Sequence, residues 1–180
     1  MAAERASRGQ DGAQVTVREA RSAEHAPLGE LTVAAYEQLP LSAEDPDHDA
    51  YLEEIRDVAA RARYCTIYAA VDADGRLLGG VTYVPGPGTP VSECELEGEA
   101  GFRMLAVDPA AQGRGVGRAL VEACIERARA DGRSGLALLT LPSMRAAHRL
   151  YERLGFARAP DRDWEFAPGF VLRCYVLPLR

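Results

Sequence analysis

A glycine loop between a predicted strand and a predicted helix carries the clearest chemical signal in the chain. The strand ends near Val107, the glycines are Gly113, Gly115 and Gly117, and an amphipathic helix follows directly. Glycines allow the backbone to fold closely around a bulky group, and the first turn of a helix offers unpaired N–H donors. Together these features predict a phosphate-binding site at residues 112–118.

The spacing of this loop argues against the two most familiar phosphate-binding motifs. Arg118 stands where the dinucleotide fingerprint requires its third glycine. The P-loop requires a lysine, and all 21 basic side chains of this sequence are arginine. The same composition excludes a kinase strand lysine and a lysine Schiff base with pyridoxal phosphate. A nucleotide-phosphate enzyme is therefore disfavoured.

Length and composition are typical of one soluble globular domain. The sequence has 180 residues, of which 47% are hydrophobic and 27% are charged. A net charge of −6 argues against a nucleic-acid or anionic-membrane partner, because both favour a broad basic face. The polar segment 1–14 lacks the apolar stretch of a signal peptide, and no later run is long enough to span a membrane. We expect a disordered segment over 1–14, one domain over 15–180 and a cytoplasmic location.

The cysteines and the acidic clusters give no metal-site pattern. Cys65, Cys94, Cys124 and Cys174 lie far apart, without the paired spacing of zinc or redox motifs. We expect three of them to be reduced core thiols, whereas Cys94 lies in an acidic segment and has no assigned role. The stretch 45–49 does not match a calcium loop and is interpreted as a polar turn that caps a helix.

The order of predicted elements defines the fold class. Helical periodicity predicts helices over 23–39, 51–63, 115–131 and 143–154. Apolar, β-branched runs predict strands over 15–18, 64–71, 77–84, 99–107, 135–141 and 170–179, and a further strand that begins at Phe156. A hairpin turn is expected at Asp74-Gly75. This order predicts an α/β fold of three layers, α/β/α, in which helices cover both faces of a mixed central sheet.

Both this order and the local residues resemble the GNAT superfamily of acetyl-CoA-dependent N-acetyltransferases. The family's pyrophosphate loop is Gln or Arg, two variable residues, Gly, one variable residue, then Gly or Ala, and 112–117 matches every fixed position. A second block, 150–156, is similar to the helix-to-strand segment that closes over the acyl-CoA tail. The chain departs from the family at Met144, where an asparagine is common. The two blocks cover about residues 99–156.

The resemblance implies a mostly antiparallel central sheet, acetyl-CoA as co-substrate and no metal. Backbone groups on the strand before the loop would pair with the pantetheine amides, and the loop would hold the diphosphate. The implied cofactor-binding residues are Leu105, Ala106, Val107, Gln112, Gly113, Arg114, Gly115, Val116, Gly117 and Arg118.

The resemblance also implies roles for side chains outside the loop. Tyr151 would protonate the departing thiolate, although its spacing equally fits a member of an apolar helix stripe. Glu99 is the candidate general base from the acidic run of Glu93, Glu95, Glu97 and Glu99, which also fits a solvated face. Tyr36 and Trp164 come from regions that flank the acceptor pocket in the family, and core packing is the alternative for each.

The implied function is N-acetylation by direct attack of an amine on acetyl-CoA. The acceptor would be a primary amine of a small molecule or peptide, and the protein would be a monomer or homodimer. An alternative from another class stays open, namely a catalytically silent acyl-CoA-binding or sensing module of the same fold.

Overall fold

A computed structural model describes residues 5–8, 14–38 and 48–179, and their fold divides into two units. The first unit contains Met1–Tyr83 and Met104–Ala123, and the second contains Val84–Arg103 and Cys124–Arg180. Strand β5 (Glu99–Val107) and helix α4 (Val116–Ala130) each contribute residues to both units.

The first unit is a sheet with helices packed on it, and the registers given for its strands, from β1 to β4, are antiparallel. Its strands are neighbours in the order β1-β2-β3-β4-β5. Leu28, Val58, Ile67 and Ala69 form a buried apolar cluster that joins two of the helices to β3. The elements that precede β5 are β1 (Arg5–Arg8), β2 (Gln14–Glu19), η1 (Ser22–Glu24), α1 (His25–Tyr36), α2 (His48–Arg56), α3 (Val58–Arg61), β3 (Thr66–Val71) and β4 (Leu77–Val84).

Two features of the first unit differ from the sequence-based expectation. Arg5–Arg8 lie in the segment 1–14 that we expected to be disordered, yet they form β1, antiparallel to β2. The helix predicted over 51–63 is instead two helices that break at Asp57. The Asp57 carboxylate accepts a hydrogen bond from the Ala60 N–H at 2.9 Å, so this residue caps a new helix rather than continuing the first one.

The β3–β4 hairpin turns where the sequence predicts. Gly75 has a backbone φ of 80°, in the left-handed region that favours glycine. The Asp72 carboxylate accepts hydrogen bonds from the N–H groups of Asp74 and Arg76 at 3.0 and 2.9 Å. These contacts close the turn from within, as Asp side chains commonly do.

The second unit contains the one parallel strand pair among the registers that the structure gives. Its strands are neighbours in the order β5-β6-β9-β7, and β8 pairs with β9. β5 and β6 are parallel but pair only from Glu99–Gly135 to Gly101–Ala137, although β6 continues to Thr140. The elements of this unit that follow β5 are β6 (Gly135–Thr140), α5 (Arg145–Arg153), β7 (Ala157–Arg158), η3 (Pro160–Arg162), β8 (Trp164–Ala167) and β9 (Phe170–Pro178).

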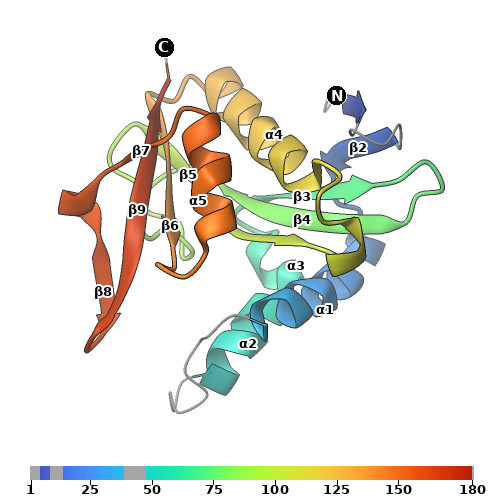
Figure 1. Cartoon of the computed structure of the whole chain (residues 1–180), viewed down its shortest axis with the longest axis horizontal. Helices are drawn as coiled ribbons and strands as arrows, with labels where there is room; N and C mark the ends of the chain where they lie inside the picture. The colour runs from blue at the N-terminus through green and yellow to red at the C-terminus, as the bar shows by residue number, and fades with distance from the viewer. Residues whose placement is uncertain (1–4, 9–13, 39–47, 180) are drawn as a thin grey trace. The chain divides into compact units, whose positions relative to one another are not determined.

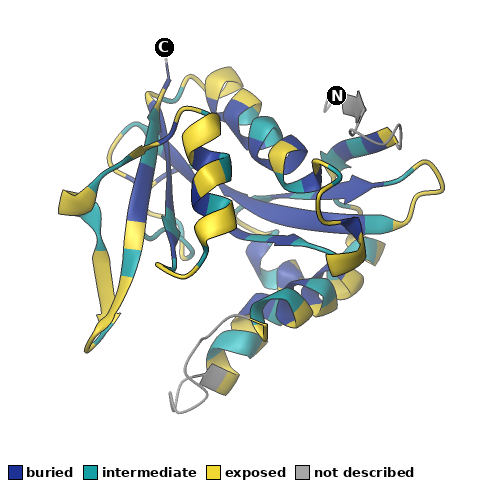
Figure 2. Cartoon of the chain, viewed as in Figure 1, coloured by how far each residue is buried: buried dark blue, intermediate teal, exposed yellow. Residues whose placement is uncertain are grey.

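Burial distinguishes the centre of this unit from its edge. β6 is almost wholly buried, whereas β8 and the start of β9 are largely exposed (Figure 2). The sequence analysis predicted no strand at Trp164–Ala167, and β8 is short, bounded by prolines and largely exposed. The mixed sheet with its packed helices confirms the expected α/β class, as Figure 1 shows.

Gly29 allows two helices of the first unit to approach closely. It is buried on α1, and a Cβ built there would collide with the backbone carbonyl of Arg56 at the end of α2. Backbone atoms cannot rotate away as a side chain can, so close approach at this position requires glycine.

Replacing Gly29 with alanine should therefore destabilise the protein, by about 1–3 kcal/mol, as overpacking of a core typically does. Helix propensity acts in the opposite direction, because alanine is favoured over glycine by about 1 kcal/mol within a helix. Chemical denaturation measures the free energy of unfolding. Ala34→Gly on the exposed side of α1 serves as the propensity control. A Gly29→Ala protein more stable than the parent would contradict the close approach.

Candidate functional site

The turn from β5 into α4 is organised by Asp108. Its backbone N–H donates to the carbonyl of Leu78 on β4 at 2.9 Å. Its carboxylate accepts a hydrogen bond from the Ala110 N–H at 2.8 Å and so caps η2 (Pro109–Ala111). Arg76 forms an ion pair with the same carboxylate at 3.1 Å. The chain therefore leaves the sheet and enters the glycine loop in one defined direction.

Two of the three glycines in the loop adopt left-handed backbone conformations, and Gly117 lies in the first turn of α4. Gly113 and Gly115 have φ values of 79° and 81°. A Cβ at either position would meet nothing within 4 Å, so their side-chain positions face open space. Val116 is 1% exposed and anchors the start of α4 in the core. The loop thus combines a buried anchor with an open backbone surface.

The first turn of α4 presents N–H groups that the helix does not use. The Ala119 N–H donates to the carbonyl of Gly115 at 3.0 Å, as the helix repeat requires. The preceding N–H groups, of residues 116–118, have no acceptor one helical turn earlier. Aligned peptide dipoles add a partial positive charge of about half a unit at this end. Such a turn favours an anionic group.

The two arginines of the loop region differ in their partners. Arg118 pairs through its Nε with Glu122 Oε1 at 2.8 Å, and this hydrogen bond raises the pKa of Arg118. Arg114 is half-buried, and no carboxylate pairs with it in the described part of the chain. Arg114 is therefore the side chain of this loop whose positive charge is available to an anion.

The strand before the loop contains a local distortion. Met104 has a φ of 52°, the one positive value at a non-glycine residue of the described segments. Its side chain is buried beside Val33 and Ile55, which accounts for an otherwise unfavourable backbone conformation. Residues 105–107 follow, with Ala106 buried and its two neighbours half-buried.

A close backbone approach holds this part of β5. An ideal Cβ on Gly79 of β4 would lie 2.5 Å from the carbonyl oxygen of Ala106. The absence of a side chain at Gly79 therefore lets the backbone of β4 lie directly against residues 106 and 107.

Tyr151 lies in an aromatic cluster of the second unit. It is 3% exposed on α5, and its ring centroid is 5.8 Å from Phe102, 5.9 Å from Phe156 and 6.1 Å from Tyr175. Burial, with a further contribution from Cys124, raises the pKa of Tyr151. The phenol is therefore protonated at neutral pH and is a weaker acid than an exposed tyrosine.

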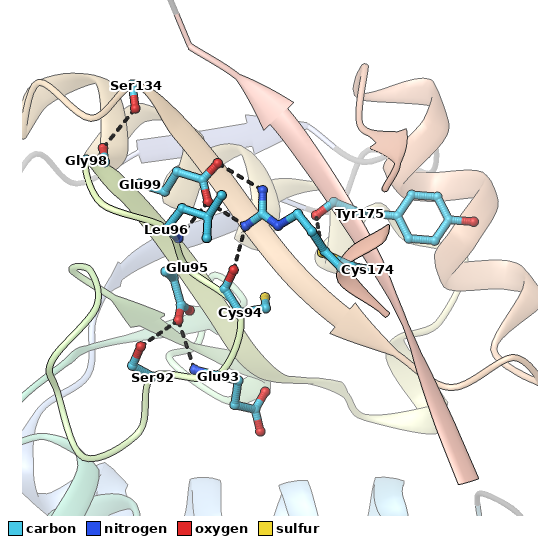
Figure 3. A network of polar contacts seen from close by, with 11 residues as sticks. Ser92, Glu93, Cys94, Glu95, Leu96, Gly98, Glu99, Ser134, Cys174 and Tyr175 are labelled. Carbon is cyan, nitrogen blue, oxygen red and sulfur yellow. Dashed lines mark hydrogen bonds and ion pairs between the residues drawn. The ribbon is translucent and has the colours of Figure 1, made fainter. Parts of the chain in front are cut away.

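Glu99 is engaged by an arginine that the sequence analysis did not identify. Arg162, in η3, donates to its two carboxylate oxygens at 3.1 and 2.6 Å, and the Leu96 N–H donates at 2.9 Å. Figure 3 shows these contacts around the Glu99 carboxylate. Burial raises the pKa of Glu99, but the hydrogen bonds from Arg162 and Leu96 outweigh it and hold the pKa below its ordinary value.

The rest of the acidic run is also mostly engaged within the second unit. Glu95 as a whole residue is 8% exposed, and its carboxylate accepts hydrogen bonds from the Ser92 hydroxyl and the Glu93 N–H. Glu93 forms an ion pair with Arg103 at 2.5 Å. Glu97 is exposed. Interpretation of the whole run as a solvated face is therefore wrong.

The remaining candidate residues occupy defined positions. Met144 is the N-cap residue of α5, gives no side-chain cap, and accepts a hydrogen bond through Sδ from the Thr140 hydroxyl at 3.6 Å. Tyr36 packs on Tyr51 in the first unit, with ring centroids 6.4 Å apart. Trp164, in the second unit, is 46% exposed and packs on Phe166. Packing against other side chains accounts for the position of Tyr36, whereas much of the Trp164 side chain is exposed.

The described residues contain no cluster of three or more His, Cys, Asp or Glu side chains able to bind a metal ion. None of their helices is long and apolar enough to cross a membrane. Asp45 and Asp47 of the expected polar turn lie outside the described residues, and Asp49 is exposed on α2.

Comparison with known proteins places these features in a family. Two of the solved structures that are similar to this chain illustrate the likeness. One is an acetyltransferase of the GNAT family from Staphylococcus aureus, with 15% identity, a TM-score of 0.69, and coverage of 92% of this chain and 99% of that one. The other is yncA of Salmonella typhimurium with its cofactor acetyl-CoA, with 22% identity, a TM-score of 0.64, and coverage of 92% and 94%.

A curated relative shares a shorter segment. Mycothiol acetyltransferase of Gordonia bronchialis is 49% identical over 55 residues, which make up 31% of this chain and 18% of that protein. The match therefore spans less than a fifth of that relative's length.

A family model described as "Acetyltransferase (GNAT) family" matches residues 30–156. This range contains most of the first unit, all of the glycine loop and the α5 segment with Tyr151. The chain belongs to the GNAT acetyltransferase family.

Proposed function

We propose that this protein transfers an acetyl group from acetyl-CoA to a primary amine of a small molecule or peptide. The observation that carries the proposal is the loop at 112–118, where Gly113 and Gly115 have positive φ and open space at their side-chain positions. With the N–H groups of the first turn of α4, this loop would form an anion site. Family membership and the acetyl-CoA-bound neighbour support acetyl-CoA as the source of that anion.

The loop and strand would divide the binding of acetyl-CoA between them. The N–H groups of residues 116–118 and the guanidinium of Arg114 would contact the diphosphate. Gln112, Gly113, Gly115 and Val116 would shape the backbone around it, while Arg118, already paired with Glu122, would contribute less charge. The backbone of residues 105–107 would pair with the pantetheine amides as an added strand does.

The reaction needs a neutral amine and a proton for the thiolate. A lysine-like amine with a pKa near 10.4 requires roughly 4–5 kcal/mol to reach its neutral form at pH 7. Attack on the thioester then expels a thiolate whose conjugate acid has a pKa of about 8.5. Tyr151 would supply the proton, because a tyrosine is protonated at neutral pH. Burial raises its pKa and makes it a weaker acid, so the transfer requires the thiolate to develop within hydrogen-bond reach of its hydroxyl.

The contacts of Glu99 favour positioning over proton abstraction. Both of its oxygens already accept hydrogen bonds from Arg162, and its lowered pKa makes it a weaker base. Glu99 would act as a base only after release by Arg162. A desolvating pocket that lowers the acceptor pKa is the simpler source of neutral amine.

An acetyl-CoA consumption screen tests the proposed reaction. The panel would contain polyamines, aminoglycosides, amino acids and peptides with free N-termini. Turnover with at least one amine is expected. Tight acetyl-CoA binding without turnover on the panel would instead favour the sensing module, which the replacement of the common asparagine by Met144 also favours.

Gly115→Ala should weaken acetyl-CoA binding by about tenfold, because a Cβ at positive φ strains the loop and projects into the space above it. Isothermal titration calorimetry measures the Kd. Gly75→Ala is the matched control, since Gly75 has nearly the same φ and equally open surroundings in the β3–β4 turn. Both variants should lose similar stability, and only the loop variant should lose affinity. Equal affinities would refute the assigned binding loop.

Tyr151→Phe should lower kcat by at least about tenfold, with a smaller change in KM for acetyl-CoA, since it removes the proton donor and keeps the ring. Steady-state kinetics with the best acceptor from the screen measures both constants. Tyr175→Phe is the control, because it removes a neighbouring hydroxyl that bonds Glu152. If the two variants lose the same activity, Tyr151 has no special role.

A further inference from the structure

The N-terminal end of α5 lacks the side-chain cap that commonly fixes a helix. Its N-cap residue is Met144, whose side chain accepts no hydrogen bond from the first turn. α5 has nine residues, and helices this short are marginal without tertiary contacts. Because Tyr151 lies on this helix, the contacts that hold α5 also determine where its phenol points.

The C-terminal end of α5 is closed by backbone hydrogen bonds around Gly155. Gly155 has a φ of 92°, and its N–H donates to the carbonyl of Glu152 at 3.0 Å. The Phe156 N–H donates to the carbonyl of Tyr151 at 3.0 Å, which completes a Schellman motif. The rings of Tyr151 and Phe156 pack together, with centroids 5.9 Å apart. A local motif therefore fixes this end, whereas the other end needs a different anchor.

His148 anchors the N-terminal half of α5 to the end of β6. Its Nε2 lies 3.0 Å from the carbonyl oxygen of Leu141, the residue that follows β6. A carbonyl oxygen can only accept, so Nε2 is the donor. The same oxygen accepts a hydrogen bond from the Met144 N–H at 3.1 Å. One carbonyl thus closes the turn after β6 and also holds the helix that follows, and His148 is buried at this junction.

The rings of His148 and Tyr151 share a packing partner on β9. The His148 ring lies 5.4 Å from the ring of Tyr175, with an interplanar angle of 31°, and the Tyr151 ring lies 6.1 Å from it. Residues three positions apart on a helix are neighbours on its surface. A displacement of the His148 ring would therefore reach Tyr151 both through the helix and through Tyr175.

The surroundings of His148 favour its neutral ring. Burial lowers the pKa of His148, and the positive charges of Arg173 and Arg158 lower it further. The hydrogen bond to Leu141 and the charge of Glu152 oppose this but do not reverse it. A neutral imidazole carries one N–H, which the contact with Leu141 places on Nε2. The ring is therefore a neutral donor at neutral pH.

We propose that His148 is a positioning residue for acetyl transfer, which holds the Tyr151 hydroxyl in place through its hydrogen bond to Leu141 and its packing on Tyr175. This role rests on the proposed function, in which Tyr151 protonates the departing thiolate. His148 acts through Tyr151 and contacts no reacting atom itself. The sequence analysis assigned no role to His148, because the carbonyl that it binds lies seven residues earlier and is not marked by any side chain.

Two amide substitutions at His148 test the hydrogen bond. The amide nitrogen of His148→Gln can occupy the place of Nε2 and donate to Leu141, whereas the shorter side chain of His148→Asn cannot reach it. In steady-state kinetics, His148→Asn should lower kcat by at least about tenfold and change KM for acetyl-CoA by less than about twofold, since misplacing a proton donor slows the chemical step. His148→Gln should keep most of the parent kcat. Arg149→Asn, at an exposed neighbouring position of α5, is the control for helix propensity.

Amide hydrogen exchange tests the anchor without turnover. A peptide that covers α5 should exchange about tenfold faster in His148→Asn than in the parent, and at the parental rate in His148→Gln. If His148→Asn fails to fold, His148→Phe takes its place, because it keeps a ring against Tyr175 and cannot donate to Leu141.

Three results would overturn the positioning role of His148: unchanged exchange in the variant without the hydrogen bond, a full kcat in that variant despite faster exchange, or equal losses of kcat in the glutamine and asparagine variants. Absence of turnover by the parent protein on the whole amine panel is a separate outcome. It would overturn the proposed function and the catalytic role of His148 together, while the exchange rates would still show whether His148 anchors α5.

Discussion

The exit of the chain from β5 depends on the hydrogen bonds of one residue, Asp108. Its N–H fixes the strand end to β4, and its carboxylate starts η2 while pairing with Arg76. The direction of the loop and the start of α4 follow from this turn. In the proposed function, backbone N–H groups would contact the anion, and because backbone groups cannot reorient as side chains do, the turn before them would set their direction.

The second unit uses arginine in a comparable way. Arg162 joins Glu99 of β5, the carbonyl of Cys94 and its own helical turn η3, while Arg158 joins Asp163 to β9. A planar guanidinium can satisfy several acceptors in fixed directions, which suits irregular segments without ladder hydrogen bonds. The acidic run before β5 is therefore mainly structural, because three of its four carboxylates have partners inside the fold.

The parts that could be predicted from sequence are those that local chemistry determines. The glycine loop, the Asp74-Gly75 turn and the bounds of β5 follow from glycine conformation, turn-forming side chains and apolar runs, and the structure has them where expected. The break at Asp57 was missed because helical periodicity continues through it. β8 was missed because its pairing with β9 is not encoded in its own four residues. The partner of Glu99 lies 63 residues away, and no local pattern marks Arg162 among other arginines.

The left-handed conformation of Met104 places two opposing demands on one position. Glycine there would relieve the backbone, at a saving of about 1–3 kcal/mol, but would leave the space beside Val33 and Ile55 unfilled. A β-branched residue would fill that space and worsen the backbone conformation. The unbranched, flexible side chain of methionine fills the space without adding the crowding of a branched Cβ. Few residue types should therefore be tolerated at position 104. Replacing Met104 with a residue of high β-propensity, such as valine or isoleucine, should fail to stabilise this strand.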